Sequence, residues 1–310
     1  GALTAGDLAG RSGLQERWLL EWLRNQAAAE IVAYRGDDRF ELTDIGAEAL
    51  CDDSSTFHVA GWFFPPIERS VVDRMAEAFR TGVGLTWDDH GSDATHWLQR
   101  TTGVQHRMLV SKVLPLLTDV VGRLEKGGSV VDVGCGAGEA VLEIARAFPR
   151  SRVLGLDPSR TAIERAQGRA EEAGLSNVEF TVMAGEELPP SGDVDFIATL
   201  DCMHDMTHPQ DFIRAARAAI KDDGTWLIKD IRSAPTFEEN RKNPMLAMMY
   251  GFSVTYCMSS ALSVPGGAGL GTMGFHPEVA RKLTSEGGFS RFRMLDYDED
   301  AFNSFYEVRP

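Results

Sequence analysis

A glycine-rich segment from Ser129 to Glu139 constrains the fold of this chain more than any other feature. Its sequence, SVVDVGCGAGE, is a short apolar run that ends in Asp132 and then turns through Gly134, Gly136 and Gly138. Glycine permits sharp bends and a close approach of the backbone to a ligand, and a helix N-terminus attracts polar or anionic groups. The segment therefore predicts a strand, a turn and a helix that bind a nucleotide-type ligand.

The next apolar run supports this interpretation. Arg152 to Leu156 closes in Asp157, about 20 residues after the turn, where an acidic side chain accepts hydrogen bonds from ribose hydroxyls. Glu139 stands where a dinucleotide fingerprint would need its last glycine, so the usual pyrophosphate turn is not matched. A nucleotide-dependent oxidoreductase stays open as an alternative, although the sequence shows no catalytic Tyr-x-x-x-Lys pair.

The run VVDVGCGAG from Val130 to Gly138 resembles the first motif of the class I S-adenosylmethionine-dependent methyltransferases. In that family the glycine turn lies against the methionine part of the cofactor, and an acid at the position of Asp157 holds the ribose. The resemblance implies S-adenosyl-L-methionine as cofactor and S-adenosyl-L-homocysteine as product. It also implies that Asp132 and Pro158 border the cofactor site.

A third expected strand, Asn177 to Met183, leads into AGEELP, which is similar to the family's adenine-side segment. Many relatives carry an aspartate that reaches the adenine amino group, and this chain has Ala184 there. We therefore expect the Gly185 backbone or Glu186 to contact the adenine.

The expected fold class is α/β, with a Rossmann-like, seven-stranded class I methyltransferase sheet and an N-terminal helical or winged-helix domain. Gly224 is expected to stop the helix before the fifth strand. The remaining elements predicted for the sheet domain are a fourth strand Asp195–Leu200, a helix Gln210–Ile220, a fifth strand Thr225–Lys229, a helix Pro277–Glu286 and a final antiparallel pair, Arg291–Asp296 and Ser304–Val308.

Three regions are expected along the chain: a winged-helix domain at 1–55, helices that link the domains and cover the substrate site at 56–126, and the cofactor-binding domain at 127–310. In the first region Thr4 caps a helix, Ser12-Gly13 makes a turn, and a hairpin turns at Gly36. The second helix, Gln15 to Ala29, is expected to bury one apolar face, which comprises Trp18, Leu19, Leu20, Trp22 and Leu23.

The charge of that second helix bears on its role. Two glutamates and two arginines give it a formal charge of zero, and the whole chain carries a net charge of −15. Such a chain repels nucleic acid, so we expect dimerisation and a scaffold role, with a homodimer as the assembly. A regulator that binds DNA through the winged helix stays open as an alternative, which salt-dependent DNA binding would revive.

Candidate catalytic residues follow the fourth strand in the sequence LDCMHDM. The His204-Asp205 pair resembles that of winged-helix O-methyltransferases, where the histidine removes the acceptor proton. An imidazole with a pKa of about 6.5 is largely neutral at physiological pH and suits a base. His204 is the candidate base, Asp205 orients it or caps the next helix, and Asp201 is expected to line the cofactor cavity. A packing role for His204 is the alternative.

A methionine-rich insertion at about 236–275 is expected to form a lid or an adaptable wall of the substrate pocket. The candidate substrate contacts are Met249, Tyr250 and Tyr256 in this insertion and Trp87 in the loop from Val83 to Gly91. Ordinary core packing for the insertion and a plain surface loop around Trp87 are the alternatives. The insertion also resembles that of actinobacterial and mycobacterial methyltransferases whose substrates are undefined.

The rest of the sequence narrows the class of protein. No apolar run approaches a membrane span, and the four cysteines form no CxxC, which favours a reducing cytoplasm and no disulfide framework. No ligand cluster for a metal stands near the fourth strand. Because the chain begins with Gly1 almost inside a helix signal, its true N-terminus is expected to lie upstream. The sequence as a whole predicts methyl transfer to a small molecule, most readily at a hydroxyl.

Overall fold

In a computed structural model of the chain, residues 1–52, 55, 58 and 67–310 are described. The chain forms two units, residues 1–63 and 64–310. The helices between residue 67 and the glycine turn therefore belong to the second unit. The predicted start of the linking region at residue 56 lies outside the described residues.

The N-terminal unit begins with a capped helix. The Thr4 hydroxyl accepts a hydrogen bond from the Asp7 amide at 3.1 Å, and the Asp7 carboxylate accepts one from the Thr4 amide at 2.9 Å. This reciprocal capping satisfies two amides at the helix start. The strands form a sheet of order β1-β3-β2. The elements of the unit are β1 (Leu3–Thr4), α1 (Ala5–Ser12), α2 (Glu16–Ala28), β2 (Ala33–Tyr34), β3 (Arg39–Glu41) and α3 (Asp44–Cys51).

The apolar face expected for α2 is only partly buried. Leu19 and Leu23 pack with Ala5 in the small core of this unit. Trp18, in contrast, is 80% exposed and Trp22 is 52% exposed. The prediction that these two tryptophans fill a buried face is therefore wrong for the single chain, because they lie on the side of α2 that faces away from that core.

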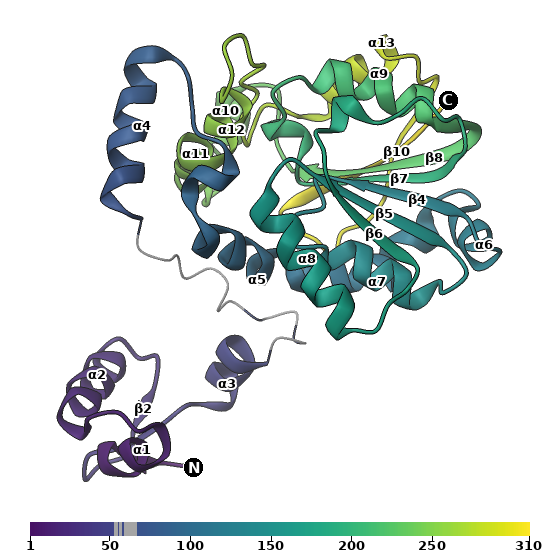
Figure 1. Cartoon of the computed structure of the whole chain (residues 1–310). Helices are drawn as coiled ribbons and strands as arrows, with labels where there is room; N and C mark the ends of the chain where they lie inside the picture. Colours follow the sequence, from purple (N-terminus) through teal and green to yellow (C-terminus); the bar gives the residue numbers. More distant parts are fainter. Residues whose placement is uncertain (53–54, 56–57, 59–66) are drawn as a thin grey trace. The chain divides into compact units, whose positions relative to one another are not determined.

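The second unit contains a seven-stranded sheet of order β6-β5-β4-β7-β8-β10-β9 (Figure 1). The first five strands in that order are parallel to one another, and β10 runs antiparallel to both of its neighbours. The predicted fold class and the final antiparallel pair are confirmed. The strands are β4 (Ser129–Val133), β5 (Arg152–Asp157), β6 (Val178–Val182), β7 (Val194–Leu200), β8 (Ile220–Ile231), β9 (Arg291–Met294) and β10 (Asn303–Arg309).

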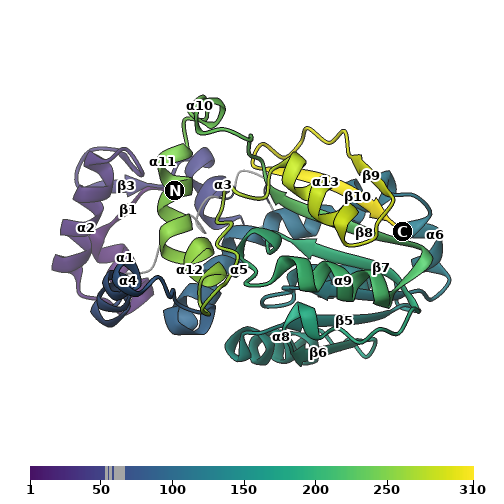
Figure 2. The same ribbon diagram turned by 90° about the horizontal axis from the view of Figure 1, so that it is seen from above.

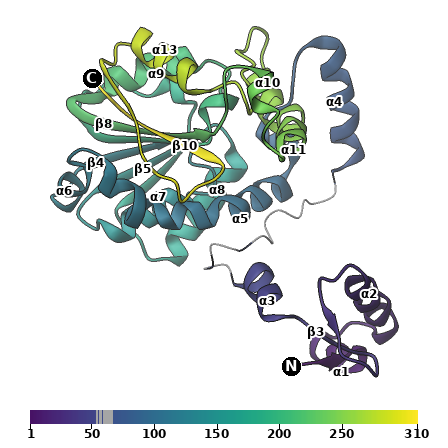
Figure 3. The ribbon, with the colours of Figure 1, turned by 180° about the vertical axis from the view of Figure 1, so that it is seen from behind.

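Helices cover both faces of this sheet (Figures 1 and 3). One face packs against α6, α7 and α8 through residues such as Phe196, and the other packs against α9 and α13 through residues such as Trp226. The layers arise because every residue of β7 is buried, so its apolar side chains need cover on both sides. The helices are α4 (Arg69–Thr81), α5 (Ser92–Met108), α6 (Val120–Glu125), α7 (Glu139–Ala147), α8 (Arg160–Glu172), α9 (Pro209–Ala219), α10 (Phe237–Asn240), α11 (Leu246–Phe252), α12 (Met258–Ala261) and α13 (Pro277–Glu286).

The methionine-rich insertion forms α10, α11, a π-helical turn η7 (Ser253–Cys257) and α12. It lies beside η6 (Met203–Asp205), the 3₁₀ turn that follows β7. Figure 2 shows α10, α11 and α12 of the insertion at one end of the strands. The insertion therefore covers the carboxyl end of a central strand, the edge at which open α/β sheets bind ligands.

One local prediction needs correction. Gly224 does not stop the helix before the fifth strand, because α9 already ends at Ala219 and β8 begins at Ile220 and runs through the glycine. Before the sheet, α5 ends at Met108 and continues as a π turn, η3 (Leu109–Val113), and a 3₁₀ turn, η4 (Leu114–Leu116), around Pro115. In the described residues, no helix combines the length and the apolar character that crossing a membrane requires.

Candidate active site

The glycine turn after β4 has the backbone that its sequence predicts. Gly134, Gly136 and Gly138 have φ values of +71°, +54° and +78°, in the left-handed region that favours glycine. A Cβ on Gly134 would lie 2.6 Å from the Cβ of Cys202, so close packing also requires that glycine. A Cβ on Gly136 would meet no atom within 4 Å. Gly136 therefore presents its backbone to open space, as the floor of a ligand site does.

The carboxylate of Asp157 ties this turn to the next strand. One oxygen accepts a hydrogen bond from the Gly136 amide at 2.9 Å, and the other accepts one from the Ser159 amide at 2.8 Å. Burial raises the pKa of Asp157 to about 6, although both amide bonds oppose the rise. The residue keeps lone pairs for a further donor such as a ribose hydroxyl.

Asp132, the last acid of β4, is buried beneath the turn with 1% of its surface exposed. Its Oδ1 has no hydrogen-bond partner in the described structure. Burial, together with the nearby Asp157, raises the pKa of Asp132 to about 8. An uncompensated buried carboxyl group of this kind is unfavourable unless a ligand contacts it, so it indicates a site for a cationic or hydrogen-bonding group.

His204 forms the tightest contact at this edge of the sheet. Its Nδ1 lies 2.7 Å from Oδ1 of Asp230, which is fully buried at the end of β8, and the same oxygen accepts a bond from the Ile231 amide at 2.7 Å. Burial alone would lower the pKa of His204, but the Asp230 carboxylate and the adjacent Cys257 raise it well above the ordinary value. The expectation that an unperturbed pKa leaves this histidine neutral is therefore wrong.

Sequence reasoning missed Asp230. It lies in the run TWLIKDI of β8, in which Lys229 is the only other charged residue, and both of these residues are almost completely buried. A buried charge in a central strand signals a partner, because isolated buried charges are strongly unfavourable. That signal was available in the sequence, whereas the identity of the partner depends on the strand order.

Asp205 and Trp87 connect two further segments. The indole Nε1 of Trp87, in the 3₁₀ turn η2 (Trp87–His90), donates to Oδ2 of Asp205 at 2.8 Å. Burial raises the pKa of Asp205 to about 7, while His204 and the Trp87 bond oppose the rise. The carboxyl group therefore contacts the loop that sequence analysis singled out.

The same turn also reaches the cofactor side. Oδ1 of Asp88 accepts from the Ser159 hydroxyl at 2.5 Å, and Oδ2 accepts from the Arg160 amide at 3.2 Å. The turn η2 thus spans from the start of α8, next to Asp157, to the His204-Asp205 pair. These contacts exclude the alternative that the segment around Trp87 is a plain surface loop.

Asp201 is held by the protein itself. It adopts a left-handed backbone with φ of +60°, and its carboxylate contacts Lys229 and Asn303. Lys229 is 3% exposed and also donates to the Gln105 side chain at 2.7 Å. Asp201 lies at the carboxyl end of β7, but its two oxygens are bound within this network.

The candidate substrate residues fall into two groups. Tyr256 stacks on Trp87 with ring centroids 5.4 Å apart and on Trp97 at 5.6 Å, and His90 lies 4.6 Å from it. Met249 packs with Leu246 and Met273 in a different cluster. Tyr250 is 38% exposed and contacts the ring of Phe237. The structure brings Trp87 and Tyr256 together, but it does not place Met249 or Tyr250 with them.

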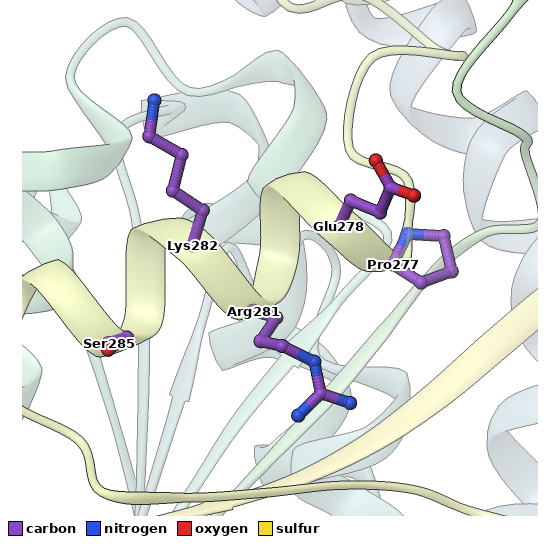
Figure 4. A pocket seen from close by; sticks show the side chains of 5 residues that line it. All are labelled: Pro277, Glu278, Arg281, Lys282 and Ser285. Atoms are coloured by element: carbon purple, nitrogen blue, oxygen red, sulfur yellow. The ribbon is translucent and has the colours of Figure 1, made fainter.

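The remaining candidates border the turn from other strands. Gly185 is buried in the 3₁₀ turn η5 (Gly185–Glu187), where a Cβ would lie 2.8 Å from the Phe212 ring, and Glu186 is partly exposed. Pro158 is exposed beside Asp157. A separate hollow on α13 is lined by five residues of that helix (Figure 4): Pro277, Glu278, Arg281, Lys282 and Ser285. It shares no residue with the glycine turn or with His204.

The comparisons with known proteins agree with this geometry. Residues 124–265 match a family model described as a methyltransferase domain. The matched residues include the glycine turn, Asp157 and the His204-Asp205 pair. A ubiquinone biosynthesis O-methyltransferase of Methylobacterium sp. (strain 4-46) is 32% identical over 111 residues, which cover 34% of this chain and 41% of that protein. The match thus spans less than half the length of that curated relative.

Solved structures show that the likeness extends beyond the methyltransferase domain. An O-methyltransferase family protein from Burkholderia thailandensis has a TM-score of 0.67 at 16% identity and matches 99% of this chain and 88% of its own. Human N-acetylserotonin methyltransferase, solved with S-adenosylmethionine, has a TM-score of 0.67 at 14% identity. The match covers 100% of this chain and 87% of that protein. At these identities the likeness shows a shared fold.

Proposed function

We propose that this protein is an S-adenosylmethionine-dependent methyltransferase that acts on a small molecule, at a hydroxyl group, with His204 as the general base. Bound S-adenosylmethionine supplies an electrophilic methyl group on a sulfonium. The proposal rests on the methyltransferase domain, on the acids around the glycine turn and on the His204-Asp230 pair.

The observation that carries the cofactor assignment is the group of three carboxyl groups, one buried and two partly buried, beside an open glycine turn. Asp132, Asp157 and Asp205 have pKa values raised to about 8, 6 and 7, chiefly by burial. A cationic ligand would stabilise their charged forms, because opposite charges within a few ångströms favour ionisation. A sulfonium compound with an amino group fits this environment, whereas an anionic dinucleotide would be repelled.

Each part of the cofactor has a matching position in the chain. Asp157 and Pro158 lie where the ribose is expected, and the backbone at Gly134, Gly136 and Gly138 would face the methionine part. Gly185 and Glu186 border the expected adenine side. Asp132, with its unpartnered Oδ1, would accept a hydrogen bond from a donor in the site. Asp201 would affect the cofactor site through its neighbours and not by direct contact, because Lys229 and Asn303 hold its carboxylate.

The His204-Asp230 pair supports the base assignment. Because Asp230 engages Nδ1, Nε2 is the nitrogen that would take the proton of a hydroxyl, and it would do so only in the neutral form of His204, which the raised pKa moves to higher pH. Methyl transfer is an in-line displacement, so the remaining task of the protein is alignment of acceptor and sulfonium at about 3–3.5 Å. Asp205, held by Trp87, would position the segment that carries His204.

The acceptor side is assigned to the aromatic group around Tyr256. Trp87, Trp97 and His90 surround that ring, and a cavity of about 220 Å³ adjoins it. The aromatic rings suit the apolar part of a small molecule, whereas the cavity has a mostly polar lining that includes Asp88, Asp89 and Asp93. Met249 and Tyr250 would contribute through the fold of the insertion rather than by touching the acceptor at Tyr256.

We also propose a homodimer formed through the N-terminal unit. Trp18 and Trp22 expose large apolar rings on α2, which is typical of surfaces that pair with another chain. Nucleic acid is disfavoured as the partner, since Arg17 pairs with Glu21 at 2.6 Å and Arg24 pairs with Asp38 at 2.9 Å. All four cysteines are free, which fits the proposed cytoplasmic location.

Calorimetric titration tests the cofactor assignment directly. The protein is titrated with S-adenosylmethionine, S-adenosylhomocysteine and NADH, and the titrations are repeated on Asp157→Ala. Binding of the first two ligands alone, weakened by the substitution, supports the proposal and justifies a screen of hydroxylated acceptors. Preferential binding of NADH would establish the oxidoreductase alternative instead.

A further inference from the structure

His106 on α5 is a partly buried histidine for which the proposed reaction has no use. Both of its ring nitrogens are shielded from solvent, and neither has a hydrogen-bond partner within the described part of the chain. Burial and three cations, Lys229, Arg107 and Arg169, lower the pKa of His106 to about 3, so the ring is neutral. A neutral donor without a partner, in a positive environment, is suited to an anion.

The helix face that carries His106 lies over the glycine turn. Earlier on the same face, His96 contacts Arg165 of α8 at 2.6 Å, and a Cβ on Gly103 would lie 4.0 Å from the carboxyl carbon of Glu139, the first residue of α7. His106 follows Gly103 by three residues, which is almost one helical turn. It is therefore directed toward the start of α7, where the glycine turn ends.

The cations around His106 are not equivalent. Arg169 pairs with Glu139 at 2.8 Å and donates to the Ala137 carbonyl at 2.7 Å, and Lys229 contacts Asp201. Arg107 forms no ion pair with any residue that the structure describes. Two of the three charges are therefore balanced, and one positive charge is left beside the unpartnered ring.

We propose that His106 binds the carboxylate of the methionine part of the cofactor by donating one ring N–H, with Arg107 supplying the uncompensated positive charge. This inference rests on the proposed function. The carboxylate is the only anionic group of S-adenosylmethionine, and the methionine part is expected against the glycine turn, at whose end α7 contacts α5. The acids Asp132 and Asp157 belong to β4 and β5 and His106 belongs to α5, so the amino group and the carboxylate of the ligand would meet opposite charges from different elements.

The test compares two ligands, of which only one carries this group. S-adenosylhomocysteine has the amino acid part with its carboxylate, and 5′-methylthioadenosine has the same thioether nucleoside with a methyl group in place of the amino acid part, so it lacks the carboxylate and the amino group. His106→Phe keeps the ring volume and removes both nitrogens, and His106→Gln keeps a donor. His96→Phe is the matched control on the same helix, because its partner is Arg165. Dissociation constants are measured by calorimetry, and melting temperatures are measured without ligand.

We expect His106→Phe to weaken S-adenosylhomocysteine binding by about tenfold or more, as for a lost hydrogen bond to a charged group, and to leave 5′-methylthioadenosine within about twofold. His106→Gln should recover part of the loss, and His96→Phe should change neither ligand. The melting temperature of unliganded His106→Phe should not fall, since the ring nitrogens have no partner to lose. If the His106→Phe variant does not fold, the affinities of the two ligands are compared in the His106→Gln variant instead.

Equal weakening of both ligands, or no weakening of either, would overturn the assignment of His106. If the unsubstituted protein binds neither ligand, the proposed cofactor itself fails and this inference falls with it. The ratio of the two affinities therefore separates failure of the carboxylate contact from failure of the proposed function.

Discussion

The imidazole of His204 and the carboxylate of Asp230 are 2.7 Å apart, although the two residues are separated by 26 positions in the chain. The contact exists because β7 and β8 are adjacent and parallel, so the residues that follow one strand meet the end of the other. Asp230 thereby engages Nδ1 and holds the ring in one orientation.

Asp230→Asn is expected to lower the pKa of His204, since it removes the carboxylate that raises the value and leaves the effect of burial. The limb of the rate profile that reports deprotonation of the base should shift to lower pH, with turnover reduced by about 10²-fold or more as the base weakens. Nitrogen-15 NMR of labelled histidine measures the shift without a substrate. Asp223→Asn, at an exposed acid that pairs with Arg123, is the control and should leave His204 unchanged. An unaltered His204 titration in Asp230→Asn would contradict the pairing.

The strand, turn and helix around Gly134, and the acid at Asp157, could be predicted because their roles are local in sequence. The partner of His204 could not, since it depends on which strands are neighbours. Side chains alternate along β8, so Lys229 and Asp230 point to opposite faces and join different networks, one with Asp201 and one with His204. Sequence spacing alone does not indicate which face each residue takes.

Helix α2 illustrates the same limit. Its apolar residues suggest one buried stripe, but the small core of the N-terminal unit has room for Leu19 and Leu23 and leaves Trp18 and Trp22 exposed. The period of a helix predicts which residues share a face. How much of that face is covered depends on the size of the core beneath it and on partners outside the chain.

Asp132→Asn is expected to stabilise the unliganded protein at pH 8. Burial raises the folded-state pKa of Asp132 to about 8 from an ordinary 3.8, so its contribution to stability is present below about pH 4 and is lost as pH rises through 8. Asparagine does not ionise, so the variant does not lose this stability. The difference in free energy of unfolding between the variant and the parent should grow from pH 4 to pH 8 toward about 1–3 kcal/mol. Urea unfolding at both pH values measures it. A variant that is less stable than the parent at pH 8 would contradict the assignment of an unpartnered carboxyl group.

Trp87→Phe is expected to release the turn η2 from Asp205 while the turn stays attached to Ser159. The substitution removes the 2.8 Å bond from Nε1 to Asp205, worth about 1 kcal/mol, and leaves the bond from Asp88 to Ser159. Hydrogen exchange of residues 83–91 should accelerate. The control is Trp97→Phe, which alters the other tryptophan that stacks on Tyr256 and keeps the Asp205 bond. Equal exchange in Trp87→Phe and the parent would show that this bond does not hold the turn.

Trp18→Glu combined with Trp22→Glu is expected to convert the proposed dimer into a monomer. The two rings are 80% and 52% exposed in the single chain, so charges there would oppose the burial of this surface without disturbing the core of the unit. Light scattering coupled to size-exclusion chromatography gives the mass. Phe79→Glu, at a ring that is 77% exposed on α4, is the control and should retain the parent mass. A parent protein that is already monomeric would refute the dimer.

Gly136→Ala separates the ligand-binding role of the glycine turn from its backbone strain. Gly136 and Gly174 both have left-handed backbones, with φ of +54° and +64°, and a Cβ at either would meet no atom within 4 Å. Alanine at each position should therefore destabilise the fold by a similar amount, about 1–2 kcal/mol. Only the methyl group at position 136 would project into the proposed cofactor site, and it should weaken S-adenosylhomocysteine binding by at least about tenfold. Gly174→Ala, at the turn after α8, should leave the affinity unchanged. Equal affinities in the two variants would mean that the open space at Gly136 is not where the cofactor binds.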